Sequence, residues 1–392
     1  MFLNFLFYLT FILFSLGQLS RFSFFGQQIN VYLYEFFLLL IAVSLIFKYR
    51  VRPIQDSFRN FRIVYFLLGS LFISYLVNLT GFKPEENFLG GLYLLRLMIY
   101  FLYFFYLTFH VQKQPLFKKT LGGGLITFFL LTMLFSVLQY FLYPDLRNLI
   151  YAGWDPHLYR IFGTFFDTSV AGAIYGLIFL TLFLKGKDFL QNKWLLTGFT
   201  AFYFIFCVFT FSRSLYITLL AVITLLTLQK RWYKRFLIFL ALFIMLIVIS
   251  PKPFGEGVNL GRIFSVRSRL TDYQNGLKIW SRQPMFGIGY NRIRYAKRQL
   301  NIISEVESDI THSGASFHSS FLVILVSGGV IGLILFSGVL VKLAGGGEFA
   351  KYATIFLSLL SISDNIVLHP FILFLLFTLL PLTLVNPSRK LR

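Results

Sequence analysis

Residues 314–341, GASFHSSFLVILVSGGVIGLILFSGVLV, pass from a short polar stretch into a long apolar run. A helix that crosses a bilayer needs about 20 mainly apolar residues, and this run is long enough. Similar runs recur from one end of the chain to the other, and no soluble domain fits between them. Of the 392 residues, 57% are hydrophobic and only 13% are charged, which is unlike an ordinary soluble domain. The sequence therefore predicts an integral membrane protein.

The apolar runs predict one all-α membrane domain over residues 1–392, a polytopic protein with about 12 transmembrane helices. No basic region precedes the first run and no A-x-A site follows it, so we expect a retained helix rather than a cleaved signal peptide. The predicted spans lie near residues 2–18, 30–47, 62–80, 90–110, 121–142, 169–184, 194–211, 214–228, 235–250, 318–341, 352–368 and 370–385.

The distribution of Lys and Arg predicts the orientation of these spans. Short cytoplasmic loops carry an excess of basic residues, and here the excess places both termini in the cytoplasm. The net charge of +21 is then explained largely by cytoplasmic flanks. We therefore expect contacts with membrane lipids and no nucleic-acid partner.

Residues 251–317 are predicted to form a long periplasmic loop with short amphipathic helices. The loop has ten Lys or Arg residues against five Asp or Glu residues, and such an excess on the outer side favours an anionic partner. One predicted helix lies along the membrane surface, because helical spacing places five apolar side chains on one face. These are Val266, Leu270, Tyr273, Leu277 and Trp280. The alternative for each basic residue is simple contact with lipid headgroups.

Arginines from three outer segments are predicted to reach the same membrane face. Arg160 lies in the segment 143–169, and Arg213 lies in the tight turn FTFSRSLY. Arg267 and Arg269 lie in the long loop. The planar guanidinium group suits phosphate, so these side chains could bind a diphosphate and stabilise its departure. Contact of Arg213 with headgroups is the alternative.

His318 is the candidate general base. It lies in the first turn of the predicted span 318–341, where the positive helix end and the arginines should disfavour an imidazolium ion. A neutral ring can accept a proton, although histidine at an interface can also be a simple anchor. The secondary candidates are Asp167, His312, Tyr273 and Arg292.

We expect no cofactor and no protein-bound metal, because no acidic or cysteine cluster lies near the histidines at metal-ligand spacing. The lone Cys207 cannot form a disulfide within the chain. Asp364 falls inside the predicted span 352–368, where a structural hydrogen bond is the favoured role.

Four stretches resemble the bacterial O-antigen ligase and O-antigen polymerase superfamily. RIFGTFFDTSVA at 160–171 is similar to its Arg-x-x-Gly-Thr-Phe segment, and TFSRS at 210–214 to its Thr-x-Ser-Arg turn. RLTDYQNGLKIWSRQPMFGIG at 269–289 has its Pro-x-x-Gly-x-Gly ending, and HSSFLVILVSGGVIG at 318–332 resembles its His-Asn-x-x-Leu segment. The sequence departs from the family at Thr168–Ser169, at Tyr273 and at Ser319.

The resemblance implies a membrane glycosyltransferase of the bacterial cytoplasmic membrane. Such an enzyme would move a glycan from undecaprenyl diphosphate to an acceptor hydroxyl at the periplasmic face, by a metal-independent inverting mechanism. His318 would remove the acceptor proton, while Arg160, Arg213 and Arg269 would bind the diphosphate.

The acceptor divides the possible activities. A ligase would use a lipid A core sugar, and a polymerase would use a second lipid-linked glycan. A protein serine or threonine is a third possible acceptor, and the ligase is slightly favoured. A different class, a flippase or transporter of lipid-linked glycans, would place its charges in a midplane cavity between repeats. The charges here lie at one face, and no repeat is visible.

Overall fold

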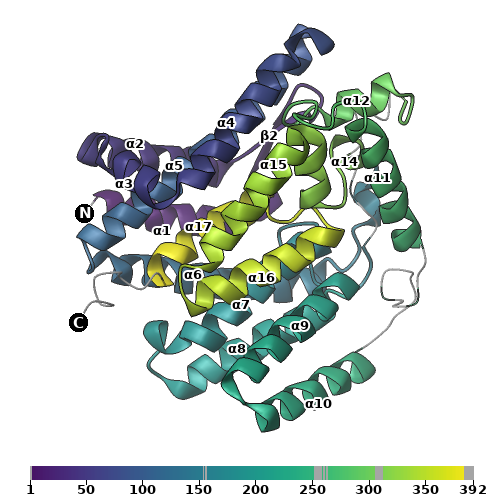
Figure 1. Cartoon of the computed structure of the whole chain (residues 1–392). Helices are drawn as coiled ribbons and strands as arrows, with labels where there is room; N and C mark the ends of the chain where they lie inside the picture. The colour runs from purple at the N-terminus through teal and green to yellow at the C-terminus, as the bar shows by residue number, and fades with distance from the viewer. Residues whose placement is uncertain are drawn as a thin grey trace.

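A computed structural model describes residues 2–152, 154, 157–250, 258, 261, 264–304 and 312–383. The described chain is almost entirely helical (Figure 1). One short antiparallel hairpin pairs β1 (Arg21–Phe24) with β2 (Ile29–Tyr32). The predicted all-α class is confirmed.

Each predicted span overlaps one α-helix. In chain order these helices are α1 (Phe2–Ser15), α2 (Leu33–Tyr49), α4 (Arg62–Val77), α5 (Pro84–Lys113), α6 (Phe117–Leu142), α7 (Thr168–Phe189), α8 (Lys193–Phe209), α9 (Arg213–Lys230), α10 (Tyr233–Ile249), α15 (Ser320–Ala344), α16 (Glu348–Ser363) and α17 (Pro370–Thr383).

The described chain has further helices outside these spans. They are α3 (Arg52–Asn60), which precedes α4, and, in the described part of the long loop, α11 (Phe264–Trp280), α12 (Ile293–Gln299) and α14 (His312–Ala315). The described chain also has the short 3₁₀ helices η1 (Gly17–Ser20), η2 (Leu79–Gly81) and η3 (Arg147–Ala152).

Five helices of the described chain are long and apolar enough to cross a membrane: α5, α6, α7, α9 and α15. A sixth crossing is possible if α3 and α4, which are bent by 97° at their junction, count as one span. These helices are consistent with a membrane protein. The number of twelve crossings, the periplasmic location of residues 251–317 and the orientation of the termini stay predictions.

Aromatic side chains join the two ends of the chain. α1 packs against α2 and α6, while α17 packs against α5 and α7. At the centre, the Phe14 ring lies 4.6 Å from that of Phe374 and 4.7 Å from that of Phe128. Burial of such rings supplies the main favourable packing energy of a core. The N-terminal helices, which have no recognisable motif, are thus part of the same core as the C-terminal helices.

A break in α15 fixes the long loop to the bundle. Gly329 has a φ of +66° within the helix. The loop 284–289 hydrogen-bonds there through its backbone: Val330 N donates to Pro284 O at 2.9 Å, and Ile288 N donates to Val326 O at 3.0 Å. A Cβ on Gly287 (φ +68°) would lie 2.5 Å from Val326 O. Glycine is required because the two backbones approach so closely.

The helix α11 packs against α15 with a different face from the one that its apolar stripe suggested. Gly276 and Ile279 are buried on the packed face, and a Cβ on Gly276 would lie within 3 Å of the Leu322 side chain. Val266, Leu270 and Leu277 of the predicted stripe are exposed. Location of this helix on a membrane surface remains a prediction, and exposed apolar side chains are compatible with it.

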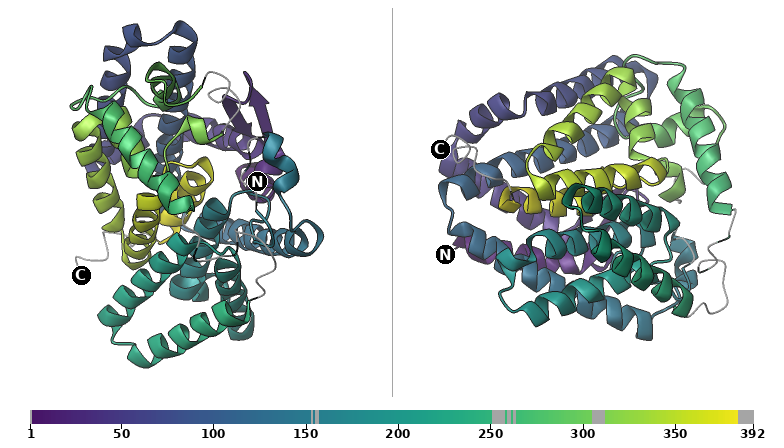
Figure 2. Two further views of the ribbon diagram at one scale, coloured as in Figure 1. Left: turned by 90° about the vertical axis from the view of Figure 1, so that its right-hand side faces the viewer. Right: turned by 60° about the horizontal axis from the view of Figure 1, so that its bottom comes forward.

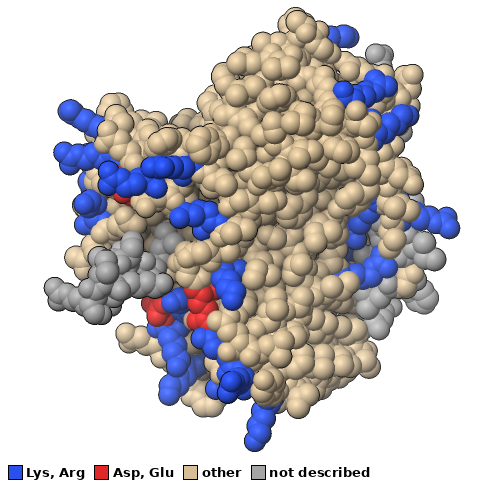
Figure 3. All heavy atoms as spheres, viewed as in Figure 1, with Lys and Arg blue, Asp and Glu red and all other residues tan. Residues whose placement is uncertain are grey.

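The surface shows a band with few charges. In Figure 3, Lys and Arg side chains gather toward the left and lower edges, where α2, α3 and the ends of α8 and α9 lie, and again on the right, near α11 and α12. A broad strip between them has almost no charge in this view. Figure 2 shows the hairpin at the same end of the molecule as the long-loop helices.

Candidate active site

His318 is held by a carboxylate of the long loop. Asp272 on α11 accepts a hydrogen bond from the His318 backbone N at 3.0 Å, and its Oδ2 lies 2.5 Å from Nδ1 of the ring. Ser319 caps α15 by accepting from Leu322 N. With Nδ1–H donating to the carboxylate, Nε2 carries the lone pair of the neutral ring. Because the His318 side chain is 41% exposed, this nitrogen can face a substrate.

The expectation that its surroundings lower the pKa of His318 is wrong. The helix end and the arginines were expected to disfavour the imidazolium ion. Instead, the hydrogen bond with Asp272 raises the pKa of His318, and the charges of Asp272 and Asp364 act in the same direction, against burial and Arg269. The carboxylate therefore outweighs the cations, and His318 is a stronger proton acceptor than a free imidazole.

Lys297 supports this pair from α12. Its buried Nζ donates to Ser316 O at 2.7 Å and lies 3.9 Å from Asp272 Oδ1. Burial lowers the pKa of Lys297 to about 8, although the charge of Asp272 raises it. The pKa of Asp272 is lowered even though burial opposes this, because His318 and Lys297 favour the carboxylate. Lys297 thus fixes the turn that presents His318.

Arg269 lies one turn before Asp272 on the same side of α11. Its Nη2 donates to Asp364 Oδ2 at 3.0 Å, and its side chain is 25% exposed. Asp364 was expected inside the span 352–368, but it lies just after α16, which ends at Ser363. Burial raises the pKa of Asp364 to about 6, and Arg269 opposes this. The pair places a guanidinium group close enough to His318 to act on its charge.

Arg160 contacts the turn between α8 and α9, and Arg213 follows that turn. Arg160 is buried, and its Nε donates to Thr210 O at 2.7 Å. Arg213 is the first residue of α9. Gln139 of α6 secures the segment by accepting hydrogen bonds from the backbone of Phe162 and Gly163. The two motifs RIFG and TFSR are therefore in contact, although about 50 residues separate them.

Asp167 lies at the start of α7, near Asp364. It caps α7 by accepting from Ser169 N at 2.6 Å and from Val170 N at 3.0 Å. Its charge also raises the pKa of Asp364, whereas a hydrogen bond from the Ser169 side chain lowers it. Asp167 is close enough to the site to act on it electrostatically, but its carboxylate is used as a helix cap.

Other candidates have structural positions. Arg292 is fully buried, with its guanidinium group 4.4 Å from the Tyr75 ring centre and 5.0 Å from that of Phe82. In this conformation its guanidinium group is packed against aromatic rings. Tyr273 ties α11 to the end of α16 by donating to Ile362 O at 2.6 Å. Arg267 is exposed on α11, and the side chain of His312 lies outside the described residues.

Among the described residues, no three His, Cys, Asp or Glu side chains are arranged to hold a metal ion. Sequence reasoning missed Asp272 and Lys297 as partners of His318. A signal was present in the spacing, because Arg269, Asp272, Gly276 and Ile279 follow intervals of three and four residues. The apolar stripe on the same helix is larger, and it suggested a different packed face.

Residues 198–337 match the family model described as O-antigen ligase. This region of the chain is therefore similar to O-antigen ligases. The match contains Arg213, Arg269, Asp272 and His318, while Arg160 precedes it. It supports the O-antigen ligase and polymerase superfamily, so the resemblance carried by the motifs is confirmed. No curated protein matches the chain. The O-antigen ligase match favours a glycosyltransferase of ligase or polymerase type in the bacterial inner membrane, with lipid-linked glycans as substrates in general.

Proposed function

We propose that this protein transfers an oligosaccharide or polysaccharide from undecaprenyl diphosphate to a hydroxyl of the lipid A core at the periplasmic face. The observation that carries the proposal is His318. Its Nδ1 is bound to Asp272, its side chain is open to a substrate, and it lies in the O-antigen ligase region.

The reaction is a single displacement. His318 Nε2 takes the proton of the acceptor hydroxyl while that oxygen forms a bond to the anomeric carbon of the donor sugar. The bond between this carbon and the diphosphate oxygen breaks, and undecaprenyl diphosphate leaves from the opposite side. Asp272 stabilises the imidazolium ion that forms. One displacement inverts the anomeric configuration.

The arginines serve the leaving group. A diphosphate carries more negative charge than a carboxylate and accepts several hydrogen bonds from a guanidinium group. It can therefore compete with Asp364 for Arg269, while Arg160 and Arg213 approach from the α8–α9 turn. Charge that develops on the departing oxygen is stabilised best by donors already in place.

Transfer in proteoliposomes tests the proposal. A defined polyprenyl-diphosphate glycan is offered with core lipid and, separately, with a second lipid-linked glycan. We expect transfer to core lipid and a loss of about 10²- to 10⁴-fold in His318→Ala, as for removal of a general base. Thermal unfolding of the variant checks that it is folded.

The matched control is Thr271→Ala, next to Asp272. The Thr271 hydroxyl donates within α11, to Arg267 O, and the side chain is exposed, so the parental rate is expected. Transfer by His318→Ala at the parental rate would reject the base. A product only on the lipid-linked glycan would identify a polymerase, and transbilayer movement without transfer would identify a transporter.

A further inference from the structure

The hairpin β1–β2 has two chemically different faces. Residues paired across an antiparallel ladder lie on the same face, and successive residues alternate between the faces. The pairs on the polar face all carry polar groups: Arg21 with Tyr32, and Ser23 with Asn30. The pairs on the apolar face carry none: Phe22 with Val31, and Phe24 with Ile29. The register of the hairpin therefore creates one polar and one apolar surface.

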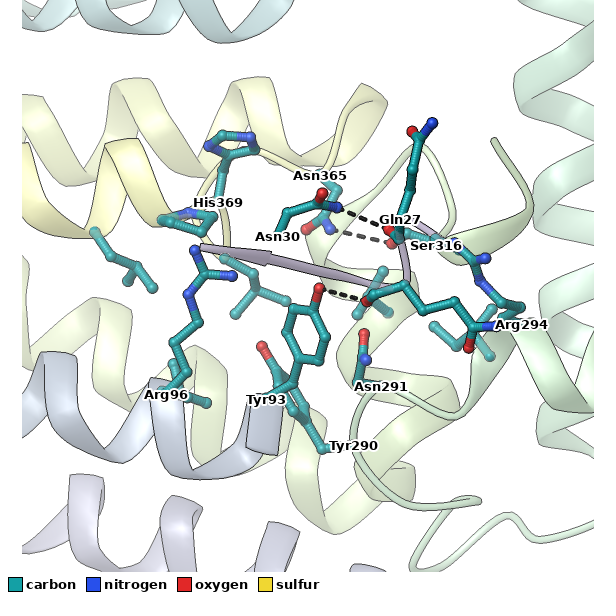
Figure 4. A pocket seen from close by; sticks show the side chains of 18 of the residues that line it. Gln27, Asn30, Tyr93, Arg96, Tyr290, Asn291, Arg294, Ser316, Asn365 and His369 are labelled. Atoms are coloured by element: carbon teal, nitrogen blue, oxygen red, sulfur yellow. Dashed lines mark hydrogen bonds between the residues drawn. The ribbon is translucent and has the colours of Figure 1, made fainter. Parts of the chain in front are cut away.

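The polar face is turned toward the inside of the protein. Arg21, Asn30 and Tyr32 line a polar cavity of about 300 Å³, whose other walls include α5 and the segment after α16 (Figure 4). Tyr32 is buried. Among the described residues of the hairpin, those of the apolar pairs do not line this cavity. The hairpin thus forms a wall of the cavity with its polar side chains.

The apolar face is turned away from the protein. Phe22 and Phe24 are 53% and 54% exposed, and Phe25 at the turn is 66% exposed. Apolar area gathered in this way is unfavourable in water and marks a contact surface. Phe25 also has a φ of +50°, a left-handed conformation that is unusual for a bulky residue. Because neither feature stabilises the hairpin in water, the apolar face is expected to have a partner outside the described residues.

The hairpin turn is held against the start of α5. The Tyr93 hydroxyl on α5 donates to Gln28 O at 2.9 Å. Phe25 and Phe88 line one surface pocket of about 580 Å³, which the turn shares with the start of α5 and with α12. The depth of α5 in a bilayer therefore determines the depth of the hairpin.

This depth is the boundary between lipid headgroups and hydrocarbon. Among the described helices, α5 is one of those long and apolar enough to cross a membrane. It has 30 residues and is about 45 Å long, whereas the hydrocarbon layer is about 30 Å thick, so a centred α5 extends about 7 Å beyond it at each end. Phe88 is about 6 Å from the start of the helix. It lies at this boundary, and so does the hairpin turn beside it.

We propose that the apolar face of the hairpin, together with Phe25, is immersed in the headgroup–hydrocarbon boundary of the bilayer. Phenylalanine is favourable at this depth because its ring leaves water. The hairpin then separates membrane lipid on one side from the polar cavity on the other. This inference goes beyond the transfer reaction and does not depend on it.

Spin labels on the protein in proteoliposomes test the depth of each side chain. Cys207 is buried, and Cys207→Ala provides a background without cysteine. Phe22→Cys, Ser23→Cys and Phe24→Cys are labelled one at a time, and collision rates are measured with oxygen, which enters the bilayer, and with a water-soluble nickel chelate. We expect the ratio of oxygen to nickel collisions to shift upward at Phe22 and Phe24 and not at Ser23, with the two-residue period of a strand.

Two reference positions calibrate the ratio. Ile334→Cys gives the value for lipid, because Ile334 is 64% exposed on the membrane-crossing candidate α15. Glu85→Cys, exposed at the start of α5, gives the value for the water side. Thermal unfolding checks that each variant is folded. If Phe22→Cys does not fold, Val31→Cys replaces it, because Val31 is its partner across the ladder.

Three results would overturn the proposal. Ratios at Phe22 and Phe24 equal to that at Glu85 would place the apolar face in water. A ratio at Ser23 as high as that at Phe24 would show that the two faces are not distinguished by lipid. Low collision rates with both reagents at Phe22 and Phe24 would show that protein, such as a second copy of the chain, covers the face. Since the measurement requires no transfer, a failure of the proposed function would leave its outcome unchanged.

Discussion

Two parts of the long loop contact the α15 region by different groups, one through charged side chains and the other through the backbone. The helix α11 presents charged side chains beside the start of α15, where Asp272 holds His318. Residues 284–289 present backbone to the glycine break, where amides and carbonyls pair directly. The first contact supplies the chemistry. The second supplies the position, because it fixes the loop that carries the charged helix.

The difference separates two kinds of substitution. A substitution in the side-chain contact between Asp272 and His318 should remove activity and leave the fold intact. A substitution of a glycine in the backbone contact should instead reduce the fraction of folded protein. Both contacts lie within motifs of the O-antigen ligase family. A motif in this chain therefore does not by itself identify a catalytic residue.

Asp272→Asn should cause the largest effect in this comparison, with a loss of transfer on the order of 10²- to 10⁴-fold. The amide cannot stabilise the imidazolium ion. Only the unprotonated ring can act as a base, so activity falls as the pH drops through the raised pKa of His318. Because Asp272 is the main cause of this raised pKa, its removal should also move the acid limb of the rate profile to lower pH.

Profiles of kcat/KM against pH for the parent and Asp272→Asn check this. An unfolding temperature close to that of the parent should accompany the loss of activity. An acid limb at the same pH in both proteins would show that His318 is not the titrating base.

Gly329→Ala should act on stability instead. Its φ of +66° disfavours a Cβ, which would also collide with the backbone of Met285. A strained φ costs about 1–3 kcal/mol, and the collision adds to this. We expect a lower unfolding temperature and less folded protein. The molecules that do fold should have the parental profile of kcat/KM against pH.

The control is Gly69→Ala on α4, because a Cβ there meets nothing within 4 Å. That variant should unfold at or above the parental temperature, since alanine favours a helix over glycine. If Gly329→Ala were as stable as this control, the glycine break would not be the contact that fixes the loop.

The fold was predictable to the extent that it depends on local sequence. A run of apolar residues specifies a helix wherever it lies, and each of the twelve ranges overlaps one α-helix. The glycine pattern 284–289 showed that a turn was present, but its docking partner at Val326 and Gly329 is determined by tertiary packing. The hairpin β1–β2 was missed because two strands of four residues have little periodicity.

The candidate site was predictable in composition and not in its electrostatics. The sequence placed His318 and Arg269 at the same face. It did not reveal that Asp272, 46 residues earlier, would lie against Nδ1. Burial of Arg292 was also hidden, because its aromatic partners Tyr75 and Phe82 belong to a distant part of the chain.

Arg213→Lys should cause a smaller loss, of about tenfold, with the fold intact. The ammonium group keeps the charge but lacks the planar fork that binds two phosphate oxygens together. Transfer rates at several donor concentrations check this, and Arg213→Gln should lose more than Arg213→Lys. Equal losses in the two variants would show that charge at this position is not used.

The smallest effect is expected for Arg267→Gln, although Arg267 was predicted to join the diphosphate site. Arg267 is exposed, while Arg269, two residues later, faces Asp364 and the base. An exposed cation contributes little in water, so the transfer rate should change by no more than about threefold. Arg269→Gln should lose far more, and both rates should be measured in liposomes with and without anionic lipid. A loss in Arg267→Gln that appears only with anionic lipid would assign Arg267 to headgroup contact. An equally large loss in both variants and both lipids would show that Arg267 does bind the diphosphate. The site would then include the exposed side of α11.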